Sequence, residues 1–217
     1  MPILELSDGF EEKVLEMAAH SPAAAMMRLS LEVDRQLRLI LAVIDRLKDY
    51  AGKSPSEALD LIAQTAVGSA IPSELRDTLD NYWVLRNQVV HSGASSSVFA
   101  LRAVDYGLRI VRMLQSIPRP SFIVTANVPI FTDRECVQPR RDVQGVLLNL
   151  FGSNGENHGR HIFPTRRKYV AGQSVSWEWD RAGIGWGATW YRDLESDKPK
   201  SAWSESLEFI GRPLDEI

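Results

Sequence analysis

The sequence of 217 residues lacks several features that mark familiar classes of protein. Cys136 is the only cysteine, so the chain can form no internal disulfide and has no cluster of thiolates for zinc. Its apolar runs are too short to cross a bilayer, and its first residues lack the basic start and apolar stretch of a secretory signal. We therefore expect a cytoplasmic protein that does not enter a membrane.

Strong charge and nucleotide-binding or metalloenzyme motifs are also missing. The formal net charge is -3, which argues against non-specific coating of nucleic acid, because such binding needs many Lys and Arg side chains that displace counterions. No Gly-rich phosphate loop stands between a predicted strand and helix, and neither HExxH nor GxSxG occurs. His158 and His161 have no third clustered ligand. We expect neither a metal nor another cofactor.

The first half of the sequence repeats its apolar residues at steps of three and four, which is the spacing of one helix face. Ser54, with Pro55 next and Glu57 three residues on, has the pattern of a capping box at a helix start. The predicted helices cover Ser7–Ala19, Pro22 to about Tyr50, a stretch from Ser54, Pro72 to about His91, and residues 98–117. The sequence thus predicts an all-helical bundle over residues 1–120.

Beyond Ser121 the pattern changes to short stretches rich in β-branched and aromatic residues, separated by turns such as GSNGENHG. Alternation is clearest in SVSWEW, where Val175, Trp177 and Trp179 would share one face. All tryptophans except Trp83 lie in this half, which favours core filling over a platform for stacking bases. We predict an α+β protein whose residues 121–217 form a small antiparallel β domain.

Basic residues gather between positions 134 and 168, where seven Lys and Arg side chains stand against three Asp and Glu. Residues 169–217 have five basic residues against nine acidic ones, so the β half has excess positive charge in its first part and excess negative charge in the rest. Such a pattern fits either an ordinary solvated surface or a face that follows a nucleic-acid backbone. For the second alternative, the candidate substrate-binding residues are Arg140, Arg141, Arg166, Arg167 and Lys168.

The stretch LRNQVVHSG at 85–93 ends the fourth predicted helix, since Gly93 accepts the left-handed angles of a helix terminus. Asn87 and His91 are four residues apart and project from nearly the same side, while Arg86 falls on the apolar stripe. A half-buried arginine needs an anionic partner, because a desolvated unpaired charge is costly.

The sequence is compatible with two kinds of anionic partner for Arg86. An internal acid, namely Asp77, Asp80 or Asp105, would neutralise Arg86, and His91 would then only interact with the last carbonyls of the helix. The other partner is a phosphate, which would give Arg86, Asn87 and His91 a common purpose.

The segment LRNQVVH resembles the signature of the HEPN superfamily, in which an Arg, a polar residue and a His lie at the end of a late helix in an all-α bundle. Arg86, Asn87 and His91 match that signature, with four residues between the Arg and the His. The resemblance covers roughly residues 8–118, including the long early helix and the approach IPSELRDTLDNYWVLRN, and does not extend to the β half.

This resemblance implies a HEPN-like helical bundle and, for an intact motif, a metal-independent endoribonuclease that acts as a homodimer. The 2′-OH of RNA would attack the adjacent phosphorus, with His91 as general base or acid near neutral pH. Arg86 would hold the non-bridging oxygens and Asn87 would orient His91 or the phosphate. A two-fold dimer would bring two copies of the motif together and supply both a base and an acid.

The sequence therefore predicts an RNA-cleaving enzyme, such as a toxin or a phage-defence effector. Its β domain would recognise the substrate, a partner, or an antidote or regulatory protein. The alternative is a non-catalytic HEPN-like interaction module whose β domain recognises a protein or nucleic-acid partner.

Overall fold

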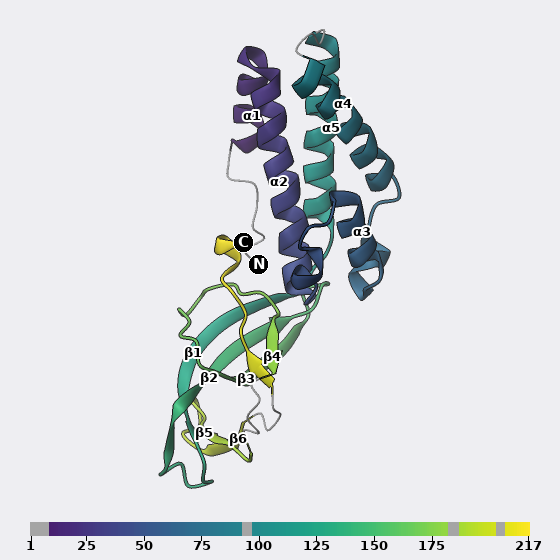
Figure 1. Cartoon of the computed structure of the whole chain (residues 1–217). Coiled ribbons are helices and arrows are strands. Elements are labelled where there is room, and N and C mark those ends of the chain that lie inside the picture. Colours follow the sequence, from purple (N-terminus) through teal and green to yellow (C-terminus); the bar gives the residue numbers. More distant parts are fainter. Residues whose placement is uncertain (1–8, 93–96, 182–186, 203–206) are drawn as a thin grey trace. The chain divides into compact units, whose positions relative to one another are not determined.

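The computed structural model describes residues 9–92, 97–181, 187–202 and 207–217, except for the side chains at 90–92, 97 and 98. The fold is mixed α+β, with helices first and an antiparallel sheet after them (Figure 1). The chain divides into two compact units, one of residues up to Leu41 with Arg46–Pro118 and one of Ala42–Asp45 with Arg119–Ile217. Among the described residues, no helix has the length and apolar character needed to cross a membrane.

The helical part contains long helices joined by short 3-10 turns. The α-helices described are α1 Phe10–His20, α2 Pro22–Val43, α3 Pro55–Ala63, α4 Leu75–Ser92 and α5 Ser97–Ser116, and the 3-10 turns are η1 Leu47–Tyr50 and η2 Ala66–Ala70. The predicted capping box at α3 is confirmed, because the Glu57 amide donates to the Ser54 hydroxyl and the Ser54 amide donates to the Glu57 carboxylate.

The long helix α2 is shorter than its apolar repeat predicts. It ends at Val43 because Asp45 has a φ of 56°, a left-handed angle that a right-handed helix cannot continue. Leu47 and Tyr50 are buried in the 3-10 turn that follows, so the apolar repeat runs past the end of the helix. The prediction that one helix extends to about Tyr50 is therefore wrong.

Helix α5 packs closely in the helical unit at Gly107. A Cβ atom added there would meet Leu29 Cδ1 at 2.8 Å and Tyr82 Cε2 at 3.0 Å, so any larger residue requires these side chains to shift. The Tyr82 hydroxyl lies 2.8 Å from the Met26 carbonyl, to which it donates, and 2.9 Å from the Ser30 hydroxyl. Burial raises the pKa of Tyr82 to about 12.

The second unit contains a curled antiparallel sheet in the strand order β3-β2-β1-β5-β6, and a separate pair formed by β4 and β7 (Figure 1). The strands are β1 Ser121–Phe131, β2 Pro139–Phe151, β3 Asn157–Thr165, β4 Trp179–Arg181, β5 Trp190–Arg192, β6 Pro199–Ser201 and β7 Leu207–Phe209, and the 3-10 turn η3 covers Leu214–Glu216. Residues 152–156 of the segment GSNGENHG form the turn from β2 into β3, and its last three residues already belong to β3.

Both faces of the long strands are packed. Ile162 of β3 belongs to an apolar cluster, whereas its neighbour Phe163 projects to the opposite face, as alternation along a strand requires. The first cluster contains Val128, Ile130, Val143, Leu147, Ile162 and Tyr191. Rings in mutual contact surround Phe163, namely Phe122, Trp177, Trp179, Tyr169 and Phe209. Trp177 and Trp179 are half-buried members of this ring cluster, which fits core filling only in part. Trp190 is half-buried with Arg134 over its ring, and Trp186 and Trp203 lie outside the described residues.

The predicted strand SVSWEW is wrong as a continuous strand. Val175 forms only an isolated bridge to Pro213, and β4 begins four residues later at Trp179. Glu178 is only 3% exposed, because its carboxylate accepts hydrogen bonds from the Arg212 guanidinium at 2.9 and 3.0 Å. An ion pair with a distant residue thus buries a position that simple alternation assigns to solvent.

Candidate functional site

Arg86 occupies a position on the apolar stripe of α4. The stripe advances by steps of four and three, and the residues on either side of Arg86 along it, Tyr82 and Val89, are buried. Earlier members Leu75 and Leu79 are also buried, whereas Arg86 is half-buried. The prediction that Arg86 occupies a position of the helix where the pattern requires an apolar residue is therefore confirmed.

The guanidinium of Arg86 has neutral neighbours in the described part of the chain. Its Cζ lies 5.6 Å from the ring centroid of Trp83, and its Nη1 donates to Asn87 Oδ1 at 3.0 Å. Its Nε is buried and has no hydrogen-bond partner among the described residues. A ring face and an amide dipole each attract a cation, but neither supplies a counter-charge.

No ion pair of Arg86 with a carboxylate is found within the described residues. Asp80 instead accepts a hydrogen bond from the Ser56 hydroxyl at 2.9 Å. Asp77 and Asp105, the other acids considered as partners, are not paired with Arg86 in that part of the chain either. The arrangement with an internal acid neutralising Arg86 is therefore not observed.

The three motif residues all lie on α4, but the structure describes them unequally. Asn87 is exposed and touches Arg86, so these two polar groups are brought together. The backbone of His91 is in the last turn of α4, while its side chain lies outside the described residues. Gly93, the predicted helix stop, also lies outside them.

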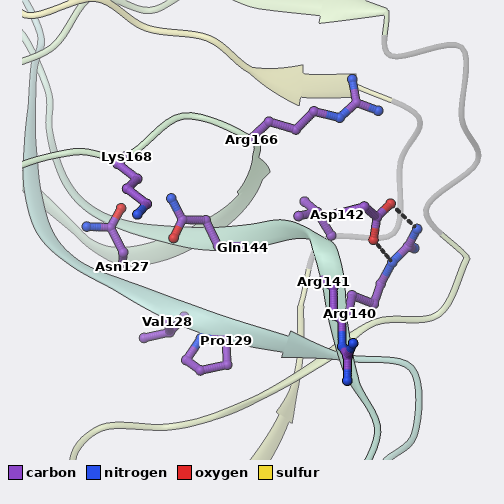
Figure 2. Close-up of a pocket in the computed structure, with 10 residues that line it drawn as sticks. Asn127, Val128, Pro129, Arg140, Arg141, Asp142, Gln144, Arg166 and Lys168 are labelled. Atoms are coloured by element: carbon purple, nitrogen blue, oxygen red, sulfur yellow. Dashed lines mark hydrogen bonds and ion pairs between the residues drawn. The ribbon is translucent and has the colours of Figure 1, made fainter.

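A cavity of about 480 Å³ opens on the β unit (Figure 2). It is lined by Asn127, Val128, Pro129, Arg140, Arg141, Asp142, Val143, Gln144, Arg166 and Lys168. Four of the five predicted substrate-binding residues are therefore gathered around one cavity. The fifth, Arg167, is not among the lining residues, and its guanidinium donates to the Ile210 carbonyl at 2.7 Å.

Arg140 and Arg141 of this cavity lie where the pairing between β1 and β2 is irregular. Along β1 the pairing passes from Pro129 to Phe131, while along β2 it passes from Gln144 to Pro139. Residues 140–143 of β2 therefore stand opposite a single β1 residue, as in an enlarged β-bulge. Pairing of β2 with β3 begins only at Gln144, so these four residues lie between two rungs of the β1–β2 ladder and beyond the end of the β2–β3 ladder.

Two side-chain amides hold the other wall of the cavity. The Asn127 side chain donates to the Tyr169 carbonyl at 2.7 Å and accepts from the Tyr169 amide at 3.3 Å. The Gln144 side chain donates to the Arg167 carbonyl. The backbone is thus fixed on both sides of Lys168. Sequence reasoning missed these amides, although a polar Asn within the apolar stretch FIVTANV is a usable signal.

The charges around the cavity are unevenly paired. Arg140 donates to both carboxylate oxygens of Asp142, at 3.2 and 3.0 Å. That hydrogen bond, reinforced by the charges of Arg140 and Arg166, lowers the pKa of Asp142 below its ordinary value. Arg141 and Lys168 are exposed, and neither has a hydrogen bond or ion pair with another described residue. The described residues that line the cavity therefore have more positive than negative charge.

Comparisons with known protein families, with curated proteins and with solved structures found no match to this chain. Within the described residues, no group of three or more His, Cys, Asp or Glu side chains is placed to hold a metal ion. His161 Nε2 lies 3.1 Å from the His158 carbonyl oxygen, a contact of ring and backbone. A functional assignment therefore depends on Arg86 with its neighbours and on the cationic cavity.

Proposed function

We propose that this chain is a metal-independent endoribonuclease of the HEPN type, with Arg86, Asn87 and His91 of α4 as its cleavage site. The observation that supports the proposal is the half-buried guanidinium of Arg86, which has an orphan Nε and no carboxylate partner among the described residues. A cation in that setting is costly unless an anion approaches it. A phosphate of RNA would supply the missing counter-charge and accept the free donors.

The proposed reaction uses Arg86, Asn87 and His91 from two copies of the chain, together with the substrate. The 2′-oxygen forms a bond to the adjacent phosphorus as the bond to the 5′-oxygen breaks, which leaves a 2′,3′-cyclic phosphate and a 5′-OH. Arg86 would hold the non-bridging oxygens, where negative charge increases in the transition state. Asn87, already bonded to Arg86, would orient the phosphate or the imidazole.

Proton transfer explains why two copies of the chain are proposed to act together. One proton must leave the 2′-OH and one must reach the departing 5′-oxygen, so a base and an acid are both useful. A single chain has one histidine in the motif, and a two-fold dimer would bring a second His91 to the same phosphate. Light scattering during RNA cleavage tests this step, because cleavage by a purely monomeric species would overturn the shared site.

The central experiment is cleavage of mixed RNAs in EDTA by the wild type, Arg86→Ala and His91→Ala. We expect the wild type to cut RNA, and each variant to lose a factor of about 10²–10⁴ in rate. Arg76→Ala is the matched control, because Arg76 is an exposed arginine on the same helix that pairs with Asp60. Full-length RNA at high wild-type concentration would overturn the nuclease proposal, as would an equal loss in Arg76→Ala.

A second function, a non-catalytic binding module, is supported by a separate observation. The cluster of cations lines a cavity of the β unit, so RNA or another polyanion could bind there without being cut. Expression in a bacterial host discriminates the two. If the chain is a nuclease toxin, the wild-type form should impair growth of the host and the His91→Ala form should not. If it is a binding module, the host should grow equally well with both forms.

A further inference from the structure

We propose that the cavity lined by Asn127–Pro129, Arg140–Gln144, Arg166 and Lys168 binds the sugar-phosphate backbone of single-stranded RNA. The choice of RNA as the polyanion rests on the proposed nuclease function. The site itself rests on the arrangement of side chains in the β unit. It would hold the substrate by its backbone while the cut is made by the residues of α4.

The charge of the cavity is the first step in this inference. Four basic side chains and one carboxylate line it, on a chain whose overall net charge is -3. Asp142 is occupied by Arg140, and Glu208 receives the Arg166 side chain at 3.2 Å. The positive charges of Arg141 and Lys168 are not balanced by another described residue. Phosphate groups would therefore be attracted to this place on a chain that is otherwise acidic.

The spread of the cations favours a polymer over a single small anion. Figure 2 shows Lys168 beside Asn127 and Gln144 at one end of the cavity, and Arg140 and Arg141 at the other. Cations at two ends of the cavity suit an anion that carries more than one phosphate. A strand with a phosphate at every nucleotide can place successive phosphates on Lys168 and Arg141.

The remaining lining indicates which part of the nucleic acid is recognised. Among the described residues that line the cavity none is aromatic, so these residues offer no ring on which a base could stack. Pro129 is exposed and offers a small apolar surface suited to sugar carbons, whereas Val128 is only 3% exposed. Asn127 and Gln144 already use their amides on the protein backbone. Binding is therefore expected to depend weakly on sequence.

A concave site also favours a single strand over a duplex. A single strand can bend so that two phosphates enter the cavity from its open side. A duplex holds its phosphates on a stiff cylinder with a persistence length of about 150 base pairs for DNA, and cannot fold into a hollow of this size. We therefore expect weak binding of duplex RNA.

The experiment measures binding where cleavage cannot occur. Fluorescence anisotropy is recorded for a short labelled single-stranded RNA with 2′-O-methyl groups, over a range of salt concentrations, with all proteins carrying Arg86→Ala. Adding Arg141→Ala and Lys168→Ala is expected to weaken binding roughly tenfold and to reduce the slope of log K against log salt by about 1.4, or about 0.7 for each phosphate that is no longer neutralised. An unchanged affinity and slope would overturn the inference.

A matched control separates a local site from a change in net charge. Arg181 and Lys198 are exposed cations of the same unit outside the cavity, so Arg181→Ala with Lys198→Ala removes the same charge. This control is expected to change the affinity less than about twofold, because distant surface charges are screened by salt. A loss equal to that of the Arg141 and Lys168 variant would show that only net charge matters and would overturn the site.

Competitors test the class of ligand. The concentrations of competitor are compared per phosphate group. If inorganic phosphate or adenosine monophosphate then displaces the labelled RNA as well as unlabelled RNA does, the cavity is a small-phosphate site and the inference fails. Equal binding of duplex RNA also overturns it. The two proposals fail separately, because binding without cleavage refutes only the nuclease, and cleavage by a chain whose binding ignores Arg141 and Lys168 refutes only the cavity.

Discussion

The guanidinium of Arg86 lies over the indole of Trp83, with 5.6 Å between Cζ and the ring centroid. Trp83 meets the ring of Tyr82 edge-on, at a centroid distance of 5.3 Å and an interplanar angle of 62°. The Tyr82 hydroxyl in turn bonds to the Met26 carbonyl of α2. Arg86 is thus positioned by a chain of rings fixed to the helical core, and the proposed contact with a phosphate would require such a fixed position.

Removing the ring under Arg86 is expected to reduce RNA cleavage without abolishing it. A cation–π contact at a partly exposed site contributes about 0.5–1 kcal/mol, so Trp83→Leu should lower kcat/KM roughly two- to fivefold. Trp83→Phe keeps a ring and should retain most of the rate. Initial rates with a labelled RNA measure both. A rate that is equal in Trp83→Leu and the wild type would show that the ring does not position Arg86.

Replacing Arg86 by leucine is expected to stabilise the chain while it stops cleavage. The side chain is half-buried on an apolar stripe with an orphan Nε, so an apolar substitute removes a desolvation cost and should add about 1 kcal/mol or more to the free energy of unfolding. Urea unfolding measures the change. Arg76→Leu is the control that should show no gain, because Arg76 is exposed and paired with Asp60. A destabilised Arg86→Leu would assign Arg86 a structural role.

Gly107→Ala is expected to destabilise the helical unit, although alanine is the better helix former by about 1 kcal/mol. The added methyl would meet the buried Leu29 and Tyr82 side chains at 2.8 and 3.0 Å, and overpacking of this kind costs about 1–3 kcal/mol. Thermal unfolding should show a lower Tm. Arg109→Ala, at an exposed position of the same helix, should leave the Tm nearly unchanged. A Tm for Gly107→Ala at or above that of the wild type would contradict close packing at α5.

The ion pair between Glu11 of α1 and Arg112 of α5 predicts a dependence of stability on pH. The hydrogen bond from Arg112 lowers the pKa of Glu11 below its ordinary value of 4.5. A lowered carboxyl pKa adds stability above the unfolded pKa, and the contribution is lost as the pH falls through the folded value. Both side chains are over a third exposed, so Glu11→Gln should cost less than about 1 kcal/mol at pH 7 and nothing in strong acid. A cost that persists in acid would exclude this ion pair as its source.

Asp142→Asn is expected to raise the affinity for single-stranded RNA roughly threefold, mainly at low salt, because it removes the carboxylate from the described lining of the cavity. Acidification to about pH 5 should not imitate the substitution, since the pKa of Asp142 is lowered and its carboxylate stays ionised there. Asp180→Asn is the control, as an exposed acid outside the cavity. Anisotropy titrations that show equal gains for both variants would exclude a local effect of Asp142.

Local patterns predict the helical half well because its determinants are close together in the sequence. The capping box needs only Ser54 and Glu57, and the place of Arg86 on its stripe follows from steps of three and four residues. The end of α2 does not follow from the apolar repeat, since the left-handed angle of Asp45 has no apolar signature. In the β half, the partner that buries Glu178 is Arg212, which lies 34 residues away and is invisible to a local pattern.

The sequence predicts that basic residues are concentrated between positions 134 and 168, but it does not predict that four of them line one cavity. Basic residues at 140–141 and 166–168 become neighbours because β2 and β3 form one hairpin, with Gln144 paired to Thr165. That register depends on the turn and on packing of both faces, so it could not be read from composition. The same reason explains Arg167, whose side chain leaves the cavity and bonds to Ile210.

The extra residues of β2 between Pro139 and Gln144 have a consequence for how the protein can vary. Arg140, Arg141 and Asp142 lie outside the paired register with β1 and β3 and outside the apolar cluster, so their side chains can be exchanged without removing a rung of either ladder, whereas Val143 is buried in that cluster. All three of these exchangeable residues are charged. Substitutions at these positions can therefore change the net charge of the cavity while the strand pairing of the sheet stays the same.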